Sequence, residues 1–81
     1  MELKDTIEMM NSTDYKDRFK AEYYQLAIRQ QKLLRMCVKY KAGTLGFVPR
    51  CSYDLLCEQL RLMGQYLMML ETRAEIEGIS L

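Results

Sequence analysis

The residues of this chain best suited to binding chemistry are the cations in the middle of the sequence. Six basic residues fall between positions 29 and 50, and no acidic residue interrupts them. They are Arg29, Lys32, Arg35, Lys39, Lys41 and Arg50. The 81-residue chain has a formal net charge of +1, so these six cations leave −5 for all other residues together. The positive charge is therefore concentrated in one segment.

Aromatic rings lie close to these cations in the sequence, at Tyr40, Phe47 and Tyr53. Arginine and lysine form charge-assisted hydrogen bonds with phosphate, and aromatic rings stack on nucleobases. We therefore predict a ligand-binding site in which Tyr40 and Phe47 stack bases. The phosphates are expected to be held by Arg35, Lys39, Lys41 and Arg50. A solvated basic surface without a ligand is the alternative, because cations are favoured near a helix C-terminus in any case.

Catalytic chemistry is not indicated by the residue types. The chain has no histidine, and no nucleophile has an obvious base beside it in the sequence. The segment 43–46 contains two glycines, but it lacks the Gly-Lys-Ser/Thr ending of a phosphate-binding loop and follows a predicted helix rather than a strand. We expect a protein that is not an enzyme and that needs no cofactor.

The three cysteines, Cys37, Cys51 and Cys57, are an odd number without a Cys-x-x-Cys pair. Because histidine is absent as well, we expect neither a metal site nor a disulfide framework. The chain opens with charged residues where a signal peptide needs an apolar segment, and no apolar run reaches the roughly 20 residues of a membrane-spanning helix. The sequence thus predicts a reduced, cytoplasmic protein with free thiols and no membrane partner.

Helices must position these residues, because apolar side chains recur at steps of three and four along two stretches. The first stretch runs through Phe19, Tyr23, Leu26, Gln30, Leu33, Cys37 and Tyr40, and the second through Leu56, Leu60, Met63, Leu67, Leu70 and Ala74. The predicted fold class is all-α: an antiparallel hairpin of two long helices at residues 14–42 and 52–78, joined by an ordered loop at 43–51. A short N-terminal helical segment at 1–10 completes a single helical domain, 1–81.

Local signals set these boundaries. Residues 11–13 and Ser52 can accept hydrogen bonds from the free amides of a helix start, and Gly43 and Gly78 can take the left-handed conformation that ends a helix. Gly64 lies inside the second helix, which favours close approach of another backbone there, although bare tolerance is equally compatible. In the loop and in the N-terminal segment, the side chains expected to pack inward are Leu45, Phe47 and Val48, and Leu3, Ile7 and Met10.

A second apolar row runs along the second helix, offset by about 100° from the first. Its members are Leu55, Leu62, Tyr66, Met69 and Ile76. One antiparallel neighbour covers a single stripe, so we predict that this row is an oligomer interface and that the hairpins assemble into an oligomeric helical bundle. The alternative is a monomer in which the N-terminal segment and the loop fold over the row.

The segment from Asp14 to Leu26 (DYKDRFKAEYYQL), with Leu55-Leu56-x-x-Gln59, Met63-Gly64-x-Tyr66-Leu67 and Leu70-Glu71-x-Arg73-Ala74-x-Ile76-Glu77-Gly78, resembles a family of small phage and prophage proteins of gut bacteria that includes crAss-like phage relatives. The resemblance covers residues 14–78 and implies viral origin and action in the host bacterial cytoplasm. In size and architecture the chain is also similar to the helical-hairpin phage proteins that act as sponges for cyclic nucleotide signals of bacterial immunity.

Together these observations lead to the hypothesis of a non-enzymatic anti-defence protein. We expect a homo-oligomer whose basic end binds and sequesters a cyclic oligonucleotide or a similar phosphorylated immune signal. An inhibitor of a host defence enzyme, comparable to an anti-CRISPR protein and acting through its exposed apolar helix face, is the alternative. A structural or regulatory accessory of the virion is a third interpretation.

Overall fold

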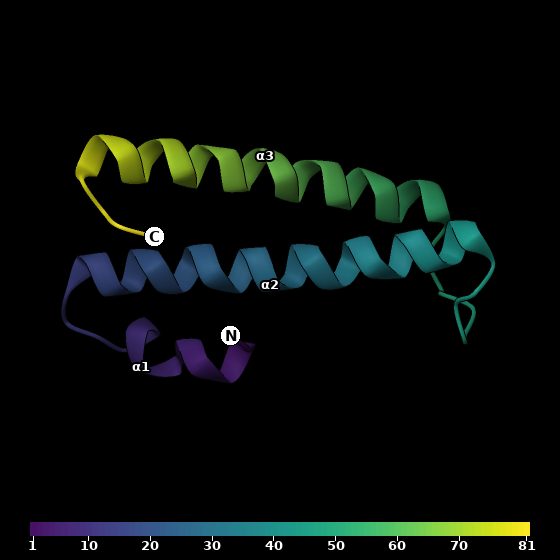
Figure 1. The fold of residues 1–81 in the computed structure, drawn as a ribbon, viewed down its shortest axis with the longest axis horizontal. Coiled ribbons are helices and arrows are strands. Elements are labelled where there is room, and N and C mark those ends of the chain that lie inside the picture. Colours follow the sequence, from purple (N-terminus) through teal and green to yellow (C-terminus); the bar gives the residue numbers. More distant parts are fainter.

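The computed structural model describes all 81 residues, and every regular element in it is helical. A short 3-10 helix, η1 (Leu3–Thr6), leads directly into α1 (Ile7–Met10), and two long helices follow, α2 (Tyr15–Ala42) and α3 (Tyr53–Glu77). Figure 1 shows α2 and α3 side by side and antiparallel, with η1 and α1 on the opposite side of α2. The prediction of an all-α helical hairpin with a short N-terminal segment is confirmed.

The long helices begin and end within a residue of the expected positions. The cap of α2, however, is Asp14 and not one of residues 11–13, because the Ser12 hydroxyl accepts a hydrogen bond from the backbone amide of Asp14 itself at 3.0 Å. Asp14 accepts a hydrogen bond from the amide of Lys16 at 2.9 Å, and Ser52 accepts one from the amide of Leu55 at 3.2 Å. Gly43 closes α2 with a φ of +78°, a left-handed conformation that other residues rarely adopt.

The core is small and lies near the N-terminal end of α2, where it meets the C-terminal end of α3. Phe19, Leu70 and Ala74 are buried there together with Ile79, which follows α3. Gly78, with a φ of +69°, turns the last residues back between the two helices (Figure 1). Only seven of the 81 residues are buried, so most of the apolar side chains of the chain remain partly or fully exposed.

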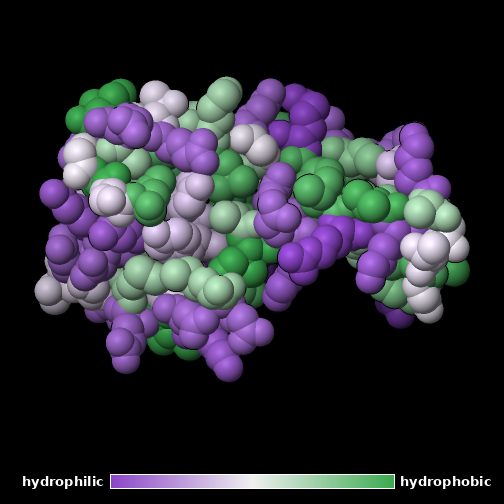
Figure 2. All heavy atoms as spheres, in the orientation of Figure 1, coloured by the Kyte–Doolittle hydropathy of each residue, from purple (hydrophilic) through white to green (hydrophobic).

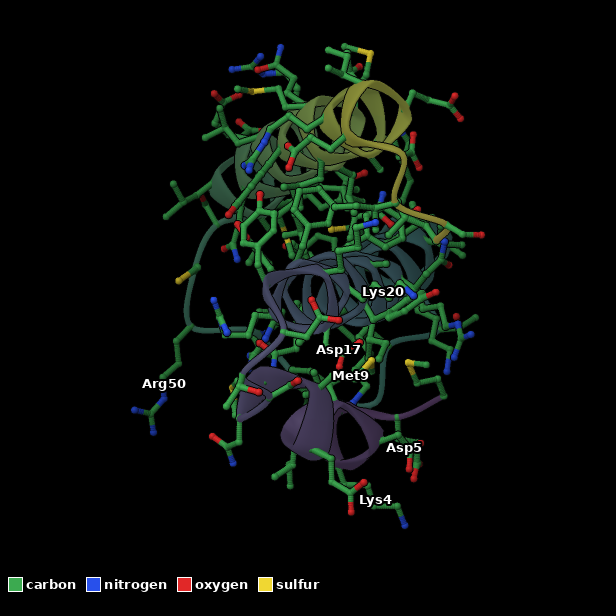
Figure 3. The ribbon with its side chains drawn as sticks, turned by 90° about the vertical axis from the view of Figure 1, so that its left-hand side faces the viewer. Lys4, Asp5, Met9, Asp17, Lys20 and Arg50 are labelled. Atoms are coloured by element: carbon green, nitrogen blue, oxygen red, sulfur yellow. The ribbon has the colours of Figure 1, made fainter.

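The N-terminal segment packs against α2 through a face that the helical spacing did not predict. Thr6 is fully buried, and its hydroxyl oxygen accepts a hydrogen bond from the side-chain amide nitrogen Nε2 of Gln25 at 2.9 Å. The segment therefore docks on the hairpin as expected, although Ile7 and Met10 stay about half exposed and Met10 meets α2 through its sulfur, which accepts a hydrogen bond from Gln25 at 3.4 Å. The reason for this exposure is the 3-10 geometry of η1, whose three residues per turn place Leu3 on the face of Thr6. Figure 3 shows Met9 in the space between α1 and α2, and Lys4 pointing into solvent.

The second apolar row of α3 stays uncovered. Leu62, Tyr66 and Met69 are exposed, as are Leu55 and Ile76 at its ends. The N-terminal segment lies against α2 and not against this row. The alternative prediction, in which the N-terminal segment and the loop fold over the row of a monomer, is therefore wrong.

The expectation for the loop fails for two of its three apolar side chains, since only Leu45 is half-buried. Phe47 is 58% exposed and Val48 is 90% exposed, so the loop does not tuck these side chains inward. A side chain added at Gly64 would meet no heavy atom within 4 Å, so no other part of this chain approaches that glycine closely. None of the helices has the length and apolar character needed to cross a membrane.

Candidate functional site

The concave side of the molecule lies below the C-terminal half of α2. Figure 2 shows it hollowed between the N-terminal segment and the loop, with hydrophilic residues above the hollow. A groove of ≈ 410 Å³ lies where the start of the chain meets α2. Its lining residues are Met1, Glu2, Tyr24, Ala27, Ile28, Gln31, Lys32 and Arg35. The groove therefore combines an apolar floor with two cations.

Helical periodicity brings these α2 residues together. Tyr24, Ile28, Gln31 and Arg35 follow one another at steps of four, three and four, which place them along one stripe of α2. Lys32 lies one residue beyond that stripe and lines the same groove. Because the capping residues fix the start of α2 and the N-terminal segment packs along it, both walls of the groove are positioned by helices.

The electrostatic character of the groove is positive. Lys32 and Arg35 lie in the basic stretch of the sequence, and the one carboxylate in the lining, Glu2, forms an exposed ion pair with Lys4 at 3.5 Å. Tyr24 presents an aromatic ring whose edge-on neighbour is Tyr23, with ring centroids 5.5 Å apart. The arrangement offers charge-assisted hydrogen bonds to an anion and an apolar surface to a flat ring.

The predicted site residues do not line one pocket. Arg35 lines the groove below α2, whereas Lys41 lines a separate hollow of ≈ 330 Å³ with Val38 and Tyr53. Six residues separate Arg35 from Lys41, which corresponds to about 120° around the helix axis. The two side chains therefore leave α2 in different directions.

The other predicted residues are spread over the loop end of the hairpin. The Tyr40 ring stacks on Tyr53, with centroids 5.0 Å apart and an interplanar angle of 11°, so one face of Tyr40 already has a partner. Phe47 and Lys39 are exposed and line none of these pockets. Arg50 points away from the helices into solvent (Figure 3). Among the predicted residues, Arg35 alone belongs to the groove below α2.

Sequence reasoning missed Tyr24, Ile28 and the N-terminal residue Met1 as parts of a site. The signal for Tyr24 and Ile28 is present, because each lies at helical spacing from the basic pair Lys32 and Arg35. No signal for Met1 exists in the sequence, since its position depends on how the N-terminal segment packs against α2.

A polar cluster holds the opposite end of the hairpin together. The Tyr15 hydroxyl donates a hydrogen bond to Glu77 at 2.9 Å and accepts one from Arg73 at 2.8 Å. The Arg73 guanidinium also lies 5.0 Å from the centre of the Phe19 ring, a distance typical of a cation–π contact. The Tyr66 hydroxyl hydrogen-bonds Glu22 across the same two helices. These contacts join α2 to α3.

Two groups have pKa values that reflect the packing of α2 on α3. The pKa of Tyr23 is raised because its hydroxyl donates a hydrogen bond to Glu71 at 2.8 Å, and burial adds to the effect. The pKa of the Cys37 thiol is raised by burial and by the neighbouring Cys57 thiol. All three cysteines are free, and no three metal-ligating side chains come together.

Comparison with protein families places the two long helices in a known group. The family described as Sequestin matches residues 13–76, which span the loop, all of α2 and nearly all of α3. Comparisons with curated proteins and with solved structures gave no significant match. The match covers well over half of the chain. The chain therefore belongs to the Sequestin family.

Proposed function

We propose that this protein is a non-enzymatic, phage-encoded anti-defence protein that sequesters a cyclic oligonucleotide or a similar phosphorylated immune signal. The name Sequestin describes a protein that holds a partner away from its target, which supports sequestration as the mode of action. The observation that carries the choice of ligand is the pair Lys32 and Arg35 beside Tyr24 in one groove.

The groove has the size and chemistry that such a ligand needs. Its ≈ 410 Å³ lies within the roughly 300–1,000 Å³ of small-molecule sites. Arg35 can grip a phosphate through two parallel hydrogen bonds, and Lys32 adds a second positive charge. A nucleobase can lie on the apolar surface of Ile28 and Ala27, next to the ring of Tyr24. Binding alone, without a bond made or broken, removes the signal from solution.

Thermal unfolding with a panel of cyclic dinucleotides and trinucleotides tests this function. A ligand present at a hundred times its dissociation constant stabilises the folded protein by about 2.7 kcal/mol. We expect a shift for one member of the panel and a stoichiometric loss of that ligand from solution on titration with the protein. Ligand recovered unchanged after denaturation establishes that no reaction takes place. The absence of any shift across the panel contradicts the proposal.

Inhibition of a host defence enzyme is the second candidate, and the exposed apolar row of α3 is the observation that favours it. An inhibitor of this kind blocks its target without consuming the signal. Measuring free signal after incubation with the protein separates the two functions, because only sequestration lowers its concentration.

A further inference from the structure

The outer face of α3 carries an apolar row with a strict seven-residue repeat. Leu55, Leu62, Met69 and Ile76 are each separated by seven positions, and all of them are exposed. Tyr66 flanks this row on the side of α2, where its hydroxyl hydrogen-bonds Glu22. A seven-residue repeat keeps side chains in line along a helix that packs on another long helix. The row is therefore suited to a second long helix and not to a small ligand.

The chain exposes more surface than a typical monomer of its mass. The chain exposes 5978 Å², whereas a monomer of its mass, 9.6 kDa, is expected to expose about 5,100 Å². The surplus of about 900 Å² reflects an elongated hairpin of 43 × 24 × 17 Å with a small core, and it is enough for a partner to cover the roughly 800 Å² per side of a standard interface.

We propose that two copies of this chain pair antiparallel along α3, around a two-fold axis between Gln65 and Tyr66. This axis lies midway between Leu55 and Ile76, and also midway between Leu62 and Met69. Each large apolar residue therefore faces an apolar residue of the other copy. A self-complementary row of this kind is what a two-fold interface requires. The inference concerns the pairing of chains and does not depend on which ligand the groove binds.

The polar residues along α3 do not oppose this arrangement. Glu58 and Arg73 lie at equal distances from the same axis, but each is already paired within its own chain, Glu58 with Arg61 and Arg73 with Tyr15 and Glu77. Glu71 and Glu75, which would repel their counterparts, lie on the opposite side of α3, where they line another groove with Tyr23. The charges thus permit close approach on the apolar side.

The dimer leaves the groove below α2 accessible. No residue of α3 lines that groove, and the N-terminal segment that borders it packs on the side of α2 away from α3. Each dimer accordingly carries two open grooves.

Met68 and Met69 provide a matched pair of test positions. Both side chains are 63% exposed, but Met69 belongs to the seven-residue row and Met68 lines the groove on the other flank of α3. We expect light scattering to give twice the 9.6 kDa chain mass for the unchanged protein and for Met68→Glu, and the single-chain mass for Met69→Glu and Leu62→Glu. Circular dichroism checks that the helices of each variant persist.

Cysteine cross-linking tests the direction of pairing in a chain carrying Cys51→Ser and Cys57→Ser. Gln65→Cys is expected to form a disulfide between copies on oxidation, since each Gln65 lies beside the axis. Gln59→Cys is expected not to do so, because its counterpart is about 20 Å away along the helix. A monomeric unchanged protein, a dimer that survives Met69→Glu in the folded state, or equal cross-linking at both positions overturns the proposal, whatever the result of the ligand panel.

Discussion

Tyr40 and Tyr53 stack face to face at the loop end of the hairpin, with ring centroids 5.0 Å apart and planes 11° apart. The contact joins the last turn of α2 to the first residue of α3. An aromatic pair in this arrangement contributes about 0.5–1.5 kcal/mol beyond the area that it buries. Tyr40, expected from sequence to stack on a nucleobase, therefore already has a structural role within the chain.

Replacement of Tyr40 tests that role. Tyr40→Ala is expected to lower the free energy of unfolding by about 1 kcal/mol, because the stacked pair is lost, and Tyr40→Phe is expected to keep most of it. Urea unfolding followed by circular dichroism measures both. Equal stability of the alanine and phenylalanine variants would falsify the structural role.

Charge reversal locates the ligand site. Arg35→Glu is expected to weaken binding of the responding cyclic nucleotide by at least tenfold, since it replaces a phosphate donor in the groove with a repelling carboxylate. Arg50→Glu changes the net charge by the same amount at a side chain that points away from the helices, and is expected to leave the affinity within about twofold at moderate salt. Titration calorimetry measures both affinities.

The reverse pattern would be a large loss of ligand affinity for Arg50→Glu and a small loss for Arg35→Glu. That pattern places the ligand at the loop end instead. That result restores the site predicted from the sequence, with Phe47 and Lys39 as further members, and removes the groove below α2 from consideration.

Gly64 offers a stabilising substitution. Its added methyl group would meet no atom of the chain within 4 Å, and alanine is favoured over glycine inside a helix by about 1 kcal/mol. Gly64→Ala is therefore expected to raise the free energy of unfolding by about that amount, with the urea midpoint moving upward and the slope unchanged. A destabilised variant indicates that another chain approaches this glycine closely.

The hydrogen bond between Tyr23 and Glu71 predicts a loss of stability in alkali. The bond raises the pKa of Tyr23 above 10.0, so the folded chain keeps this proton where the unfolded chain has lost it. Stability from this group is complete below about pH 10 and falls as the pH rises past 10 towards the raised pKa. Tyr53, whose pKa is raised by a hydrogen bond with Cys57, adds a decline in the same direction.

The variant Tyr23→Phe separates these contributions. It lacks the ionisable hydroxyl, so its unfolding free energy should change less steeply above pH 10 than that of the unchanged protein. Identical slopes in the two proteins mean that Tyr23 ionises alike in the folded and unfolded chains.

The three thiols are expected to react at different rates. Cys51 is exposed, whereas Cys37 is buried and its pKa is raised by burial and by Cys57, which reduces the thiolate fraction. Alkylation followed by mass spectrometry should modify Cys51 first and Cys37 last. Urea should remove the difference, since unfolding exposes all three thiols equally. Rapid alkylation of Cys37 under native conditions contradicts its buried position between α2 and α3.

The helices could be predicted closely because their signals are local. Gly43, Ser52 and Gly78 act through hydrogen bonds and backbone angles within a few residues of themselves, so their types alone place three of the four boundaries of α2 and α3. The start of α2 was placed within a residue, but its cap is Asp14 and not one of residues 11–13. The face of α2 that packs on α3 followed from the spacing of Phe19 and its partners for the same reason.

The site could be predicted only in part. The cations of the basic stretch were evident, but the sequence does not say which of them share a direction, and Arg35 and Lys41 leave α2 about 120° apart. The stacking of Tyr40 on Tyr53 was equally hidden, since it depends on the path of the loop between the helices.

The sequence by itself determined a hairpin of two long helices, its caps and the excess of apolar surface on α3, because spacing and capping act over a few residues. Only the tertiary structure decided that the N-terminal segment packs on α2 through Thr6, that Ile79 closes the core and that Arg35 shares a groove with Met1. Those contacts join residues far apart in the chain, and their free energy depends on how whole helices fit together rather than on any local pattern.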